Sequence, residues 1–194
     1  MKNRELIQQK IEDSVRVKQR FSDELLSNIE LTAEKIVDCY RNGGKLILFG
    51  NGGSAADAQH IACELVGRFL KERRPLFAVA LNTNSSVLTS IGNDYGYDRI
   101  FERQVEASAK PEDVVIGIST SGNSPNIIRA IEAAHRIGST TIGMTGLSGG
   151  LLKGAADILL NVPSGETPRI QESHILIGHI ICELVERAIE EEKQ

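Results

Sequence analysis

A cluster of hydroxyl side chains lies where a buried strand is predicted to end and a helix to begin. The segment Ser119-Thr120-Ser121-Gly122-Asn123-Ser124 directly follows the apolar run 114–118 and directly precedes Pro125. A strand that ends in such a turn presents hydroxyls and backbone N–H groups, and the next helix adds the positive end of its dipole. Ser124 and Pro125 fit the N-cap and first position of that helix. The segment therefore favours a phosphate site over a loop that only caps a helix.

A second polar turn has the same position relative to another apolar run. Gly50-Asn51-Gly52-Gly53-Ser54 comes directly after the run 45–49. Glycine here is a weak signal, because tight strand-to-helix turns need glycine whatever they bind. The turn lacks the Lys-Ser/Thr pair of a P-loop and the complete G-x-G-x-x-G pattern, which disfavours a nucleotide site. Because open α/β sheets bind ligands at the carboxyl ends of their strands, we expect the two turns to hold opposite ends of one small phosphorylated molecule.

A histidine and a glutamate follow on the helix that the second turn introduces. His60 and Glu64 are four residues apart in the sequence, so they share one helix face about 6 Å apart along the axis. This spacing suits a shared metal ion or an acid–base pair, and the alternative is an ordinary surface pair. Apolar neighbours such as Ala58, Ile61 and Ala62 predict a largely buried helix, which favours the functional interpretation.

Polar side chains also interrupt the apolar last helix, namely Gln171, Glu172, His174 and His179. Gln171 and His179 are about 12 Å apart along the helix axis. Their meeting at one ion therefore requires an irregular helix end or a site that draws on more than one subunit. A histidine in an apolar helix is more often a hydrogen-bonded core residue than a ligand, and we expect this of His174 and of His135.

The apolar pattern predicts an α/β fold with a doubly wound parallel sheet of about five strands. The predicted strands are 45–49, 76–81, 113–118, 139–144 and 157–162. The predicted helices are two within 3–42, followed by 54–70, 84–91, 97–109, 125–137 and 169–192. We expect one domain over 1–194, made of an N-terminal helical extension, 1–42, and an α/β core, 43–194. The first two helices have apolar faces, which predicts packing against a second subunit.

Composition limits the classes of partner. The chain has 194 residues, with 22 basic and 26 acidic side chains and a net charge of −4, so no electrostatic footprint for nucleic acid is visible. Its apolar runs are shorter than the ~20 residues of a membrane span. The three cysteines, Cys39, Cys63 and Cys182, and a polar N-terminus indicate reduced thiols and a cytoplasmic protein.

Five blocks of this sequence together point to one known family. They are Gly50-Asn51-Gly52-Gly53-Ser54, His60 with Glu64, Gly92-Asn93-Asp94-Tyr95-Gly96, the segment 117–124, and Arg169-Ile170-Gln171-Glu172 with His179. In their order and spacing they resemble the phosphoheptose isomerases, also called sedoheptulose 7-phosphate isomerases, among the sugar-isomerase (SIS) domain proteins. The resemblance covers essentially the whole chain and implies a flavodoxin-like SIS fold. It also implies a homotetramer that converts sedoheptulose 7-phosphate to D-glycero-D-manno-heptose 7-phosphate, an early step of bacterial heptose and lipopolysaccharide biosynthesis.

The resemblance also assigns roles to individual residues. Glu64 and His179 would be the catalytic acid–base pair. The substrate would contact Asn51, Gly52, Gly53, Ser54, Glu64, Asn93, Asp94, Ser119, Thr120, Ser121, Ser124 and Gln171, with the four hydroxyl residues from 119 onward holding the phosphate. One zinc ion per subunit would be bound by His60, Glu64, Gln171 and His179.

Two departures and two alternatives accompany this interpretation. Asn84 stands where several relatives have aspartate, and Pro168 precedes Arg169; neither departure removes a catalytic group, and both would alter the sugar end of the site. One alternative is a non-catalytic SIS-domain protein that binds a replication initiator, and the other is a sugar-phosphate-sensing module. The presence of both Glu64 and His179 favours the enzyme, because neither alternative needs an acid–base pair.

Overall fold

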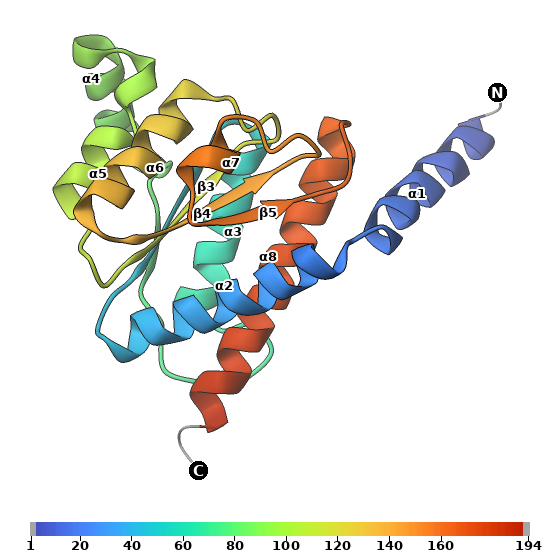
Figure 1. Cartoon of the computed structure of the whole chain (residues 1–194), viewed down its shortest axis with the longest axis horizontal. Coiled ribbons are helices and arrows are strands. Elements are labelled where there is room, and N and C mark those ends of the chain that lie inside the picture. The colour runs from blue at the N-terminus through green and yellow to red at the C-terminus, as the bar shows by residue number, and fades with distance from the viewer. Residues whose placement is uncertain (1–2, 192–194) are drawn as a thin grey trace.

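The computed structural model describes residues 3–191 and shows a parallel sheet covered by helices on both faces (Figure 1). The strands are β1 (Leu46–Gly50), β2 (Ala78–Ala80), β3 (Val114–Ile118), β4 (Thr140–Thr145) and β5 (Ile158–Asn161). Their order is β2-β1-β3-β4-β5, and every neighbouring pair is parallel. All residues of β1 and β3 are buried, as expected of strands covered on both faces. The predicted doubly wound α/β class is confirmed.

Two helical layers cover the sheet. The helices are α1 (Asn3–Gln19), α2 (Asp23–Arg41), α3 (Gly53–Val66), α4 (Ser85–Tyr95), α5 (Glu102–Ser108), α6 (Pro125–Ile137), α7 (Leu152–Ala155) and α8 (Thr167–Glu191). One apolar core joins α2, α3 and α8 to the sheet, and a second core joins α5, α6 and α7 to the other face. The chain order reverses between β1 and β3, where a doubly wound fold opens its ligand crevice.

Several predicted boundaries differ from the structure. Strand β2 is only three residues long, although backbone bonds from the Leu46 amide to the Phe77 carbonyl and from the Leu81 amide to the Leu48 carbonyl continue its pairing with β1. The helix predicted over 97–109 is instead a 3₁₀ turn, Tyr97–Arg99, followed by the shorter α5. Helix α7 was not predicted, because its four residues are too few to show a helical period.

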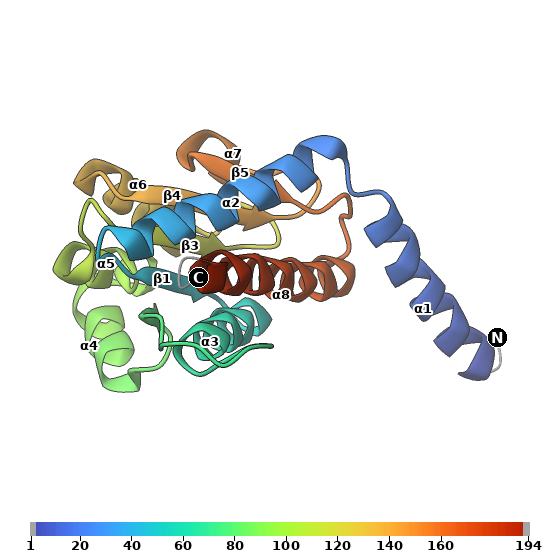
Figure 2. The same cartoon turned by 90° about the horizontal axis from the view of Figure 1, so that it is seen from below.

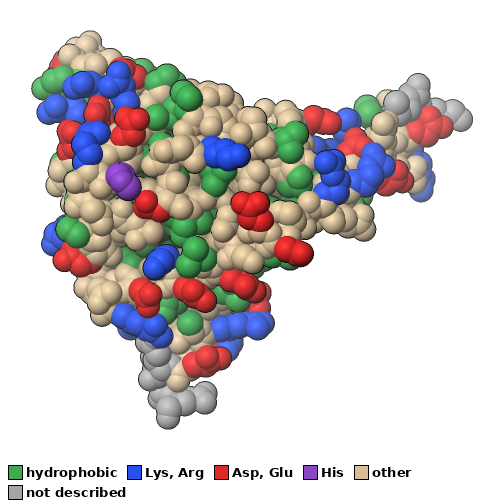
Figure 3. Space-filling view, viewed as in Figure 1, with side chains coloured by type: hydrophobic (Ala, Val, Ile, Leu, Met, Phe, Trp, Pro, Cys, Tyr) green, Lys and Arg blue, Asp and Glu red, His purple; other side chains and the backbone are tan. Residues whose placement is uncertain are grey.

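Helix α1 projects from the rest of the molecule as an arm (Figures 1 and 2). Its exposed apolar side chains are Leu6, Ile7, Ile11 and Val15, which are 44–60% exposed. Val17 is the residue of α1 that is buried, close to the start of α2. Figure 3 shows charged side chains of both signs beside hydrophobic ones on this arm. The apolar face predicted for the first helix is therefore present and uncovered within one chain.

Candidate functional site

A cavity of about 320 Å³ opens at the carboxyl ends of β1 and β3, between the two turns that the sequence singled out. Its lining consists of Asn51, Gly52, Gly53, Ser54, Ile118, Ser119, Thr120, Ser124, Thr167 and Gln171. The structure thus brings together most of the predicted substrate contacts. Thr167 and Ile118 were not predicted, since only the fold places them beside the two turns.

The hydroxyls of the turn 119–124 face one another. Ser119 Oγ lies 2.9 Å from Ser124 Oγ and 3.5 Å from Ser121 Oγ. Ser124 occupies the N-cap position of α6, with Pro125 following, but its side chain makes no capping bond to the helix. Its hydroxyl is turned toward Ser119 instead. Hydroxyls gathered at a helix N-terminus in this way suit an anion.

Glycine contacts fix the shape of this turn. Gly122 has a φ of +68°, and a Cβ there would lie 2.1 Å from the carbonyl oxygen of Gly149. Both the backbone conformation and the close approach therefore require glycine. The amides of Leu151 and Leu152 donate to the Asn123 side chain and to the Gly122 carbonyl, each at 3.0 Å. The turn is held against the segment that follows β4.

Asparagine side chains connect the two turns. Asn51 and Asn126 donate to each other's amide oxygens at 3.0 and 2.9 Å, and the Tyr97 hydroxyl donates to Asn51 Oδ1 at 3.2 Å. Asn82 pairs in the same reciprocal way with the backbone of Gly50, at 2.7 and 3.3 Å. Sequence reasoning missed Asn126, Tyr97 and Asn82. The one available signal was Asn126, a polar residue at the start of a helix directly after the turn 119–124.

Helices α3 and α8 approach each other closely at two glycines. A Cβ at Gly53 would lie 2.4 Å from Gln171 Nε2, and a Cβ at Gly178 would lie 2.7 Å from Ile61 Cδ1. The absence of side chains at both positions lets the two helices run in contact. As a result, the face of α3 that follows the turn 50–54 lies directly against α8.

Three of the predicted metal ligands converge at this helix contact. His60 Nε2 lies 3.1 Å from Glu64 Oε1 and 3.1 Å from His179 Nε2. All three ligand atoms lie within 4.8 Å of one another and belong to one chain. Glu64 is half-buried, whereas the His60 side chain is 48% exposed, so the cluster is open on one side.

The donor set of this cluster fits a divalent transition metal. Two ring nitrogens and a carboxylate oxygen point toward one another, and two facing Nε2 lone pairs repel unless a proton or a cation lies between them. Two histidines and a glutamate that leave a further position open are a common catalytic metal set. The fourth predicted ligand, Gln171, lines the cavity two turns earlier on α8. The cluster of three needs neither an irregular helix nor a second subunit.

Asp57 lies on α3 between the cavity and the cluster of His60, Glu64 and His179. It is four residues after Gly53 and three before His60, so it shares their helix face. Its Oδ2 atom is buried and has no hydrogen-bond partner among the described residues. Burial raises the pKa of the Asp57 carboxyl to about 6, and the charge of His60 opposes the shift. Sequence reasoning missed this residue, although its spacing from His60 was visible.

Other predicted residues lie away from the cavity. Asn93 and Asp94 are exposed at the end of α4, where the amide of one donates to the carboxylate of the other at 2.8 Å. His174 is fully buried, and its Nε2 lies 3.1 Å from the Thr145 carbonyl, so the predicted core role is confirmed. The same prediction is wrong for His135, which is exposed in the last turn of α6 and pairs with Asp157 at 3.4 Å.

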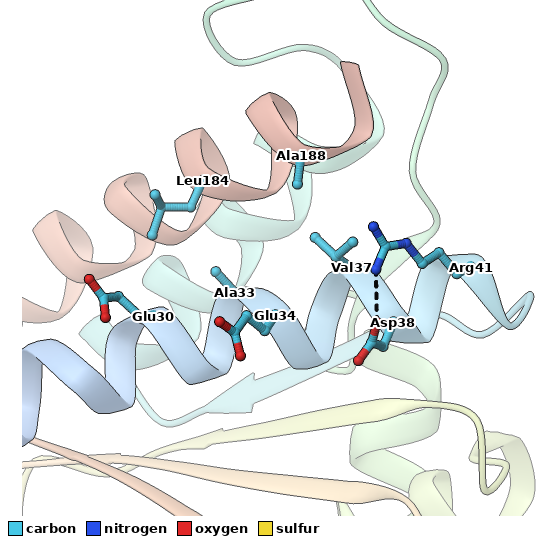
Figure 4. Close-up of a pocket in the computed structure, with 8 residues that line it drawn as sticks. All are labelled: Glu30, Ala33, Glu34, Val37, Asp38, Arg41, Leu184 and Ala188. Atoms are coloured by element: carbon cyan, nitrogen blue, oxygen red, sulfur yellow. Dashed lines mark hydrogen bonds and ion pairs between the residues drawn. The ribbon is translucent and has the colours of Figure 1, made fainter. Parts of the chain in front are cut away.

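A larger hollow of about 500 Å³ lies between α2 and α8, away from this site (Figure 4). It is lined by Glu30, Ala33, Glu34, Val37, Asp38, Arg41, Leu184 and Ala188. None of the predicted site residues lines it. The smaller cavity, which carries the hydroxyls and adjoins the cluster, is therefore the candidate site.

Fold and site together define a class of protein. The SIS domain family matches residues 11–146 of the chain. The phosphoheptose isomerase of Aquifex aeolicus is 58% identical over 171 residues, which cover 84% of this chain and 90% of the relative.

Solved structures agree with this assignment. The phosphoheptose isomerase of Neisseria gonorrhoeae superposes with a TM-score of 0.89 at 44% identity, covering 95% of this chain and 98% of the other. That of Francisella tularensis gives a TM-score of 0.92 at 38% identity, covering 96% and 100%. The chain belongs to the phosphoheptose isomerase family. These relatives confirm the predicted resemblance and enzyme class and favour it over the two alternatives.

Proposed function

We propose that this chain interconverts sedoheptulose 7-phosphate and D-glycero-D-manno-heptose 7-phosphate. The observation that carries the proposal is one arrangement on α3 and α8. A cavity lined by hydroxyls lies at one end of the helix pair, and a cluster of His60, Glu64 and His179 lies farther along it. Such an arrangement suits an extended molecule with phosphate at one end and its reacting carbons at the other.

The phosphate would occupy the hydroxyl end of the cavity. Ser119, Thr120, Ser121 and Ser124 would donate to its oxygens, and the N-terminus of α6 would stabilise its charge. The reacting carbons are remote from this group, so its binding energy would serve to position them. Asn51 and Gln171 would contact the sugar chain between the two ends.

The reaction moves a proton between adjacent carbons. A base removes a proton from C1 of the ketose, the resulting enediol transfers a proton between O1 and O2, and a proton is returned to C2. We assign Glu64 as the base at the carbons and His179 as the group that moves the proton between the oxygens. Positioned acid–base groups of this kind each contribute about 10²–10⁴-fold in rate. Asp57 lies beside them and would accept a hydrogen bond from a sugar hydroxyl.

We further propose that the cluster holds zinc. His60, Glu64 and His179 would bind it, with Gln171 as the predicted fourth ligand. A bound metal would polarise the carbonyl group of the sugar. Glu64 has two carboxylate oxygens, so binding through one leaves the other available for a proton. Metal analysis of protein purified without chelator tests this, and protein with intact activity but without stoichiometric metal would contradict it.

We also propose a homotetramer in the cytoplasm. The uncovered apolar residues of α1 would pack against another subunit, because an exposed apolar stripe of this kind usually marks an interface. Asn93 and Asp94 do not line the cavity of their own chain, which supports a role toward a neighbouring subunit's substrate. All three cysteines are free, and two of them are buried, which supports a reducing compartment. No helix among residues 3–191 is long and apolar enough to span a membrane.

The decisive test is incubation with sedoheptulose 7-phosphate, followed by NMR of the anomeric region. We expect signals of an aldose phosphate to appear, and deuterium from D₂O to enter at C2. The Glu64→Gln variant provides the matched control, because it keeps the size of the side chain and removes the base. Absence of product from folded wild-type protein, with and without added zinc, would refute the proposed reaction.

A further inference from the structure

The His179 imidazole contacts two other rings. The Phe69 ring is stacked on it with a centroid distance of 5.3 Å and an interplanar angle of 20°. His60 meets it edge-on at 5.0 Å and 61°, with the two Nε2 atoms 3.1 Å apart. The stacked contact with Phe69 restricts rotation of the imidazole. The direction in which its Nε2 points therefore depends on where Phe69 is held.

Phe69 belongs to the irregular segment 67–77, which lies between α3 and β2. Its backbone is held by one side chain of α8, Glu186. The carboxylate of Glu186 accepts hydrogen bonds from the consecutive amides of Phe69, Leu70 and Lys71 at 2.8, 2.8 and 3.1 Å. Three successive N–H groups that converge on one carboxylate fix the local backbone.

Arg73 completes the arrangement from the same segment. Its Nε lies 3.2 Å from Glu186 Oε1, and the two side chains are 0% and 1% exposed. The guanidinium also donates to the carbonyl oxygens of Glu64 at 2.7 Å, Leu65 at 2.8 Å and Gly67 at 2.9 Å. The ion pair thus joins the last turn of α3, including the backbone of Glu64, to the side of α8.

An ion pair this deeply buried is a weak way to gain stability, because desolvation of the two charges offsets much of their attraction. The two side chains also pair backbone amides and carbonyls of the segment and of the end of α3, which apolar side chains could not do. What the charges add is direction, since both carboxylate oxygens of Glu186 accept from named backbone amides and the terminal nitrogens of Arg73 donate to named carbonyls. The arrangement specifies where the segment after α3 lies.

We propose that Glu186 and Arg73 form a buried clamp that holds Phe69 against His179, and that Phe69 and Glu186 are positioning residues for the imidazole. The inference rests on the proposed function, in which His179 transfers a proton. Neither Phe69 nor Glu186 needs to touch substrate. Loss of the clamp releases the imidazole from its orientation toward His60 and Glu64, and a small misplacement of a reacting group is enough to reduce turnover strongly.

The test compares substitutions at these two positions with a matched control. Phe69→Leu removes the ring and should lower kcat at least tenfold with KM changed less than threefold, whereas Phe69→Tyr keeps the stacking ring and should recover most of kcat. Glu186→Gln should also lower kcat. The control is Glu190→Gln, one turn farther along α8. It breaks the solvent-exposed pair between Glu190 and Lys71, a residue of the same segment, and should leave kcat unchanged.

A spectroscopic measurement makes the inference independent of the reaction. In protein labelled at histidine, the His179 ring protons should be shifted upfield by Phe69, and the shift should disappear in Phe69→Leu and persist in Phe69→Tyr. An unshifted His179 signal in wild-type protein would overturn the inference even if the enzyme is active. Equal kcat in Phe69→Leu and wild type would also overturn it. If the wild-type protein lacks activity, the proposed function fails, and the ring shift still decides whether Phe69 holds the imidazole. If Glu186→Gln does not fold, the two Phe69 variants decide alone.

Discussion

Substitution of Gly178 by alanine probes the helix contact on which the whole site depends. A Cβ at this position would lie 2.7 Å from both Cγ1 and Cδ1 of Ile61. Carbon atoms normally pack at about 3.5–4.0 Å, so either the Ile61 side chain turns away or α3 and α8 separate. Because Ile61 is buried, we expect the helices to separate by up to about 1 Å. Overpacking of this kind costs about 1–3 kcal/mol, and the better helix propensity of alanine returns about 1 kcal/mol. We expect a net loss of about 1 kcal/mol in the free energy of unfolding.

Gly178→Ala should reduce turnover far more than it reduces stability. A misplacement of about 1 Å between reacting groups can cost about 10²-fold in rate, and the separation of α3 from α8 moves His179 away from His60 and Glu64. Kinetics with sedoheptulose 7-phosphate and urea unfolding measure the two effects. A suitable control is Gly154→Ala, since a Cβ there would meet nothing within 4 Å.

A double-mutant cycle tests the assigned cause. Ile61→Ala removes the two atoms that would clash, so Gly178→Ala should be less harmful in that background than in wild type, with a coupling energy of about 1 kcal/mol. The reasoning is refuted if Gly178→Ala matches Gly154→Ala in both stability and turnover, or if the cycle shows no coupling.

Three further predictions concern single groups. Glu64→Gln should reduce turnover by at least 10²-fold while calorimetry shows nearly unchanged substrate affinity, and an unaltered kcat would remove Glu64 from the chemistry. Combined Ser119→Ala and Ser124→Ala should weaken affinity for the sugar phosphate by about 10²-fold or more, since each lost hydrogen bond to a charged group is worth about 1.5–3 kcal/mol; unchanged binding would count against the phosphate site. Burial lowers the pKa of His174 from 6.5 to about 4. Between these pH values, His174 is protonated in the unfolded chain and neutral in the folded chain. Stability should therefore be lost as the pH falls from about 6.5 to 4, by about 3 kcal/mol in total, and His174→Leu should flatten this part of the pH profile.

Local pattern was sufficient to predict the sheet and both turns. The runs before Gly50 and Ser119 are apolar because both strands are covered on both faces. Each run ends at a turn of glycine and polar residues, which is recognisable from the sequence alone. Parallel pairing then places the two turns at one edge. The pairing of His60 with Glu64 is equally local, since one helical turn separates them.

Contacts between distant elements were not predictable in the same way. Nothing near Gly178 in the sequence indicates that Ile61 packs on it, and nothing near Glu186 indicates that it binds the backbone after α3. Such contacts depend on the relative position of two helices along their axes, which the tertiary packing determines. The wrong prediction for His135 has a related cause, since an apolar helix still has one face toward water and the face is set by the sheet beneath it.

Helix α3 runs from the cavity, where Gly53 is part of the lining with the hydroxyls of 119–124, to the cluster, and this has a consequence for the choice of sugar. Gly53 at the cavity and His60 in the cluster are separated by seven residues of continuous helix, a span of about 10 Å that cannot stretch or shorten. The distance between the cavity and the cluster is therefore fixed. A pentose or tetrose phosphate anchored by the same hydroxyls would leave its carbonyl short of Glu64, so chain length would be selected by rigidity rather than by contacts to individual hydroxyl groups of the sugar.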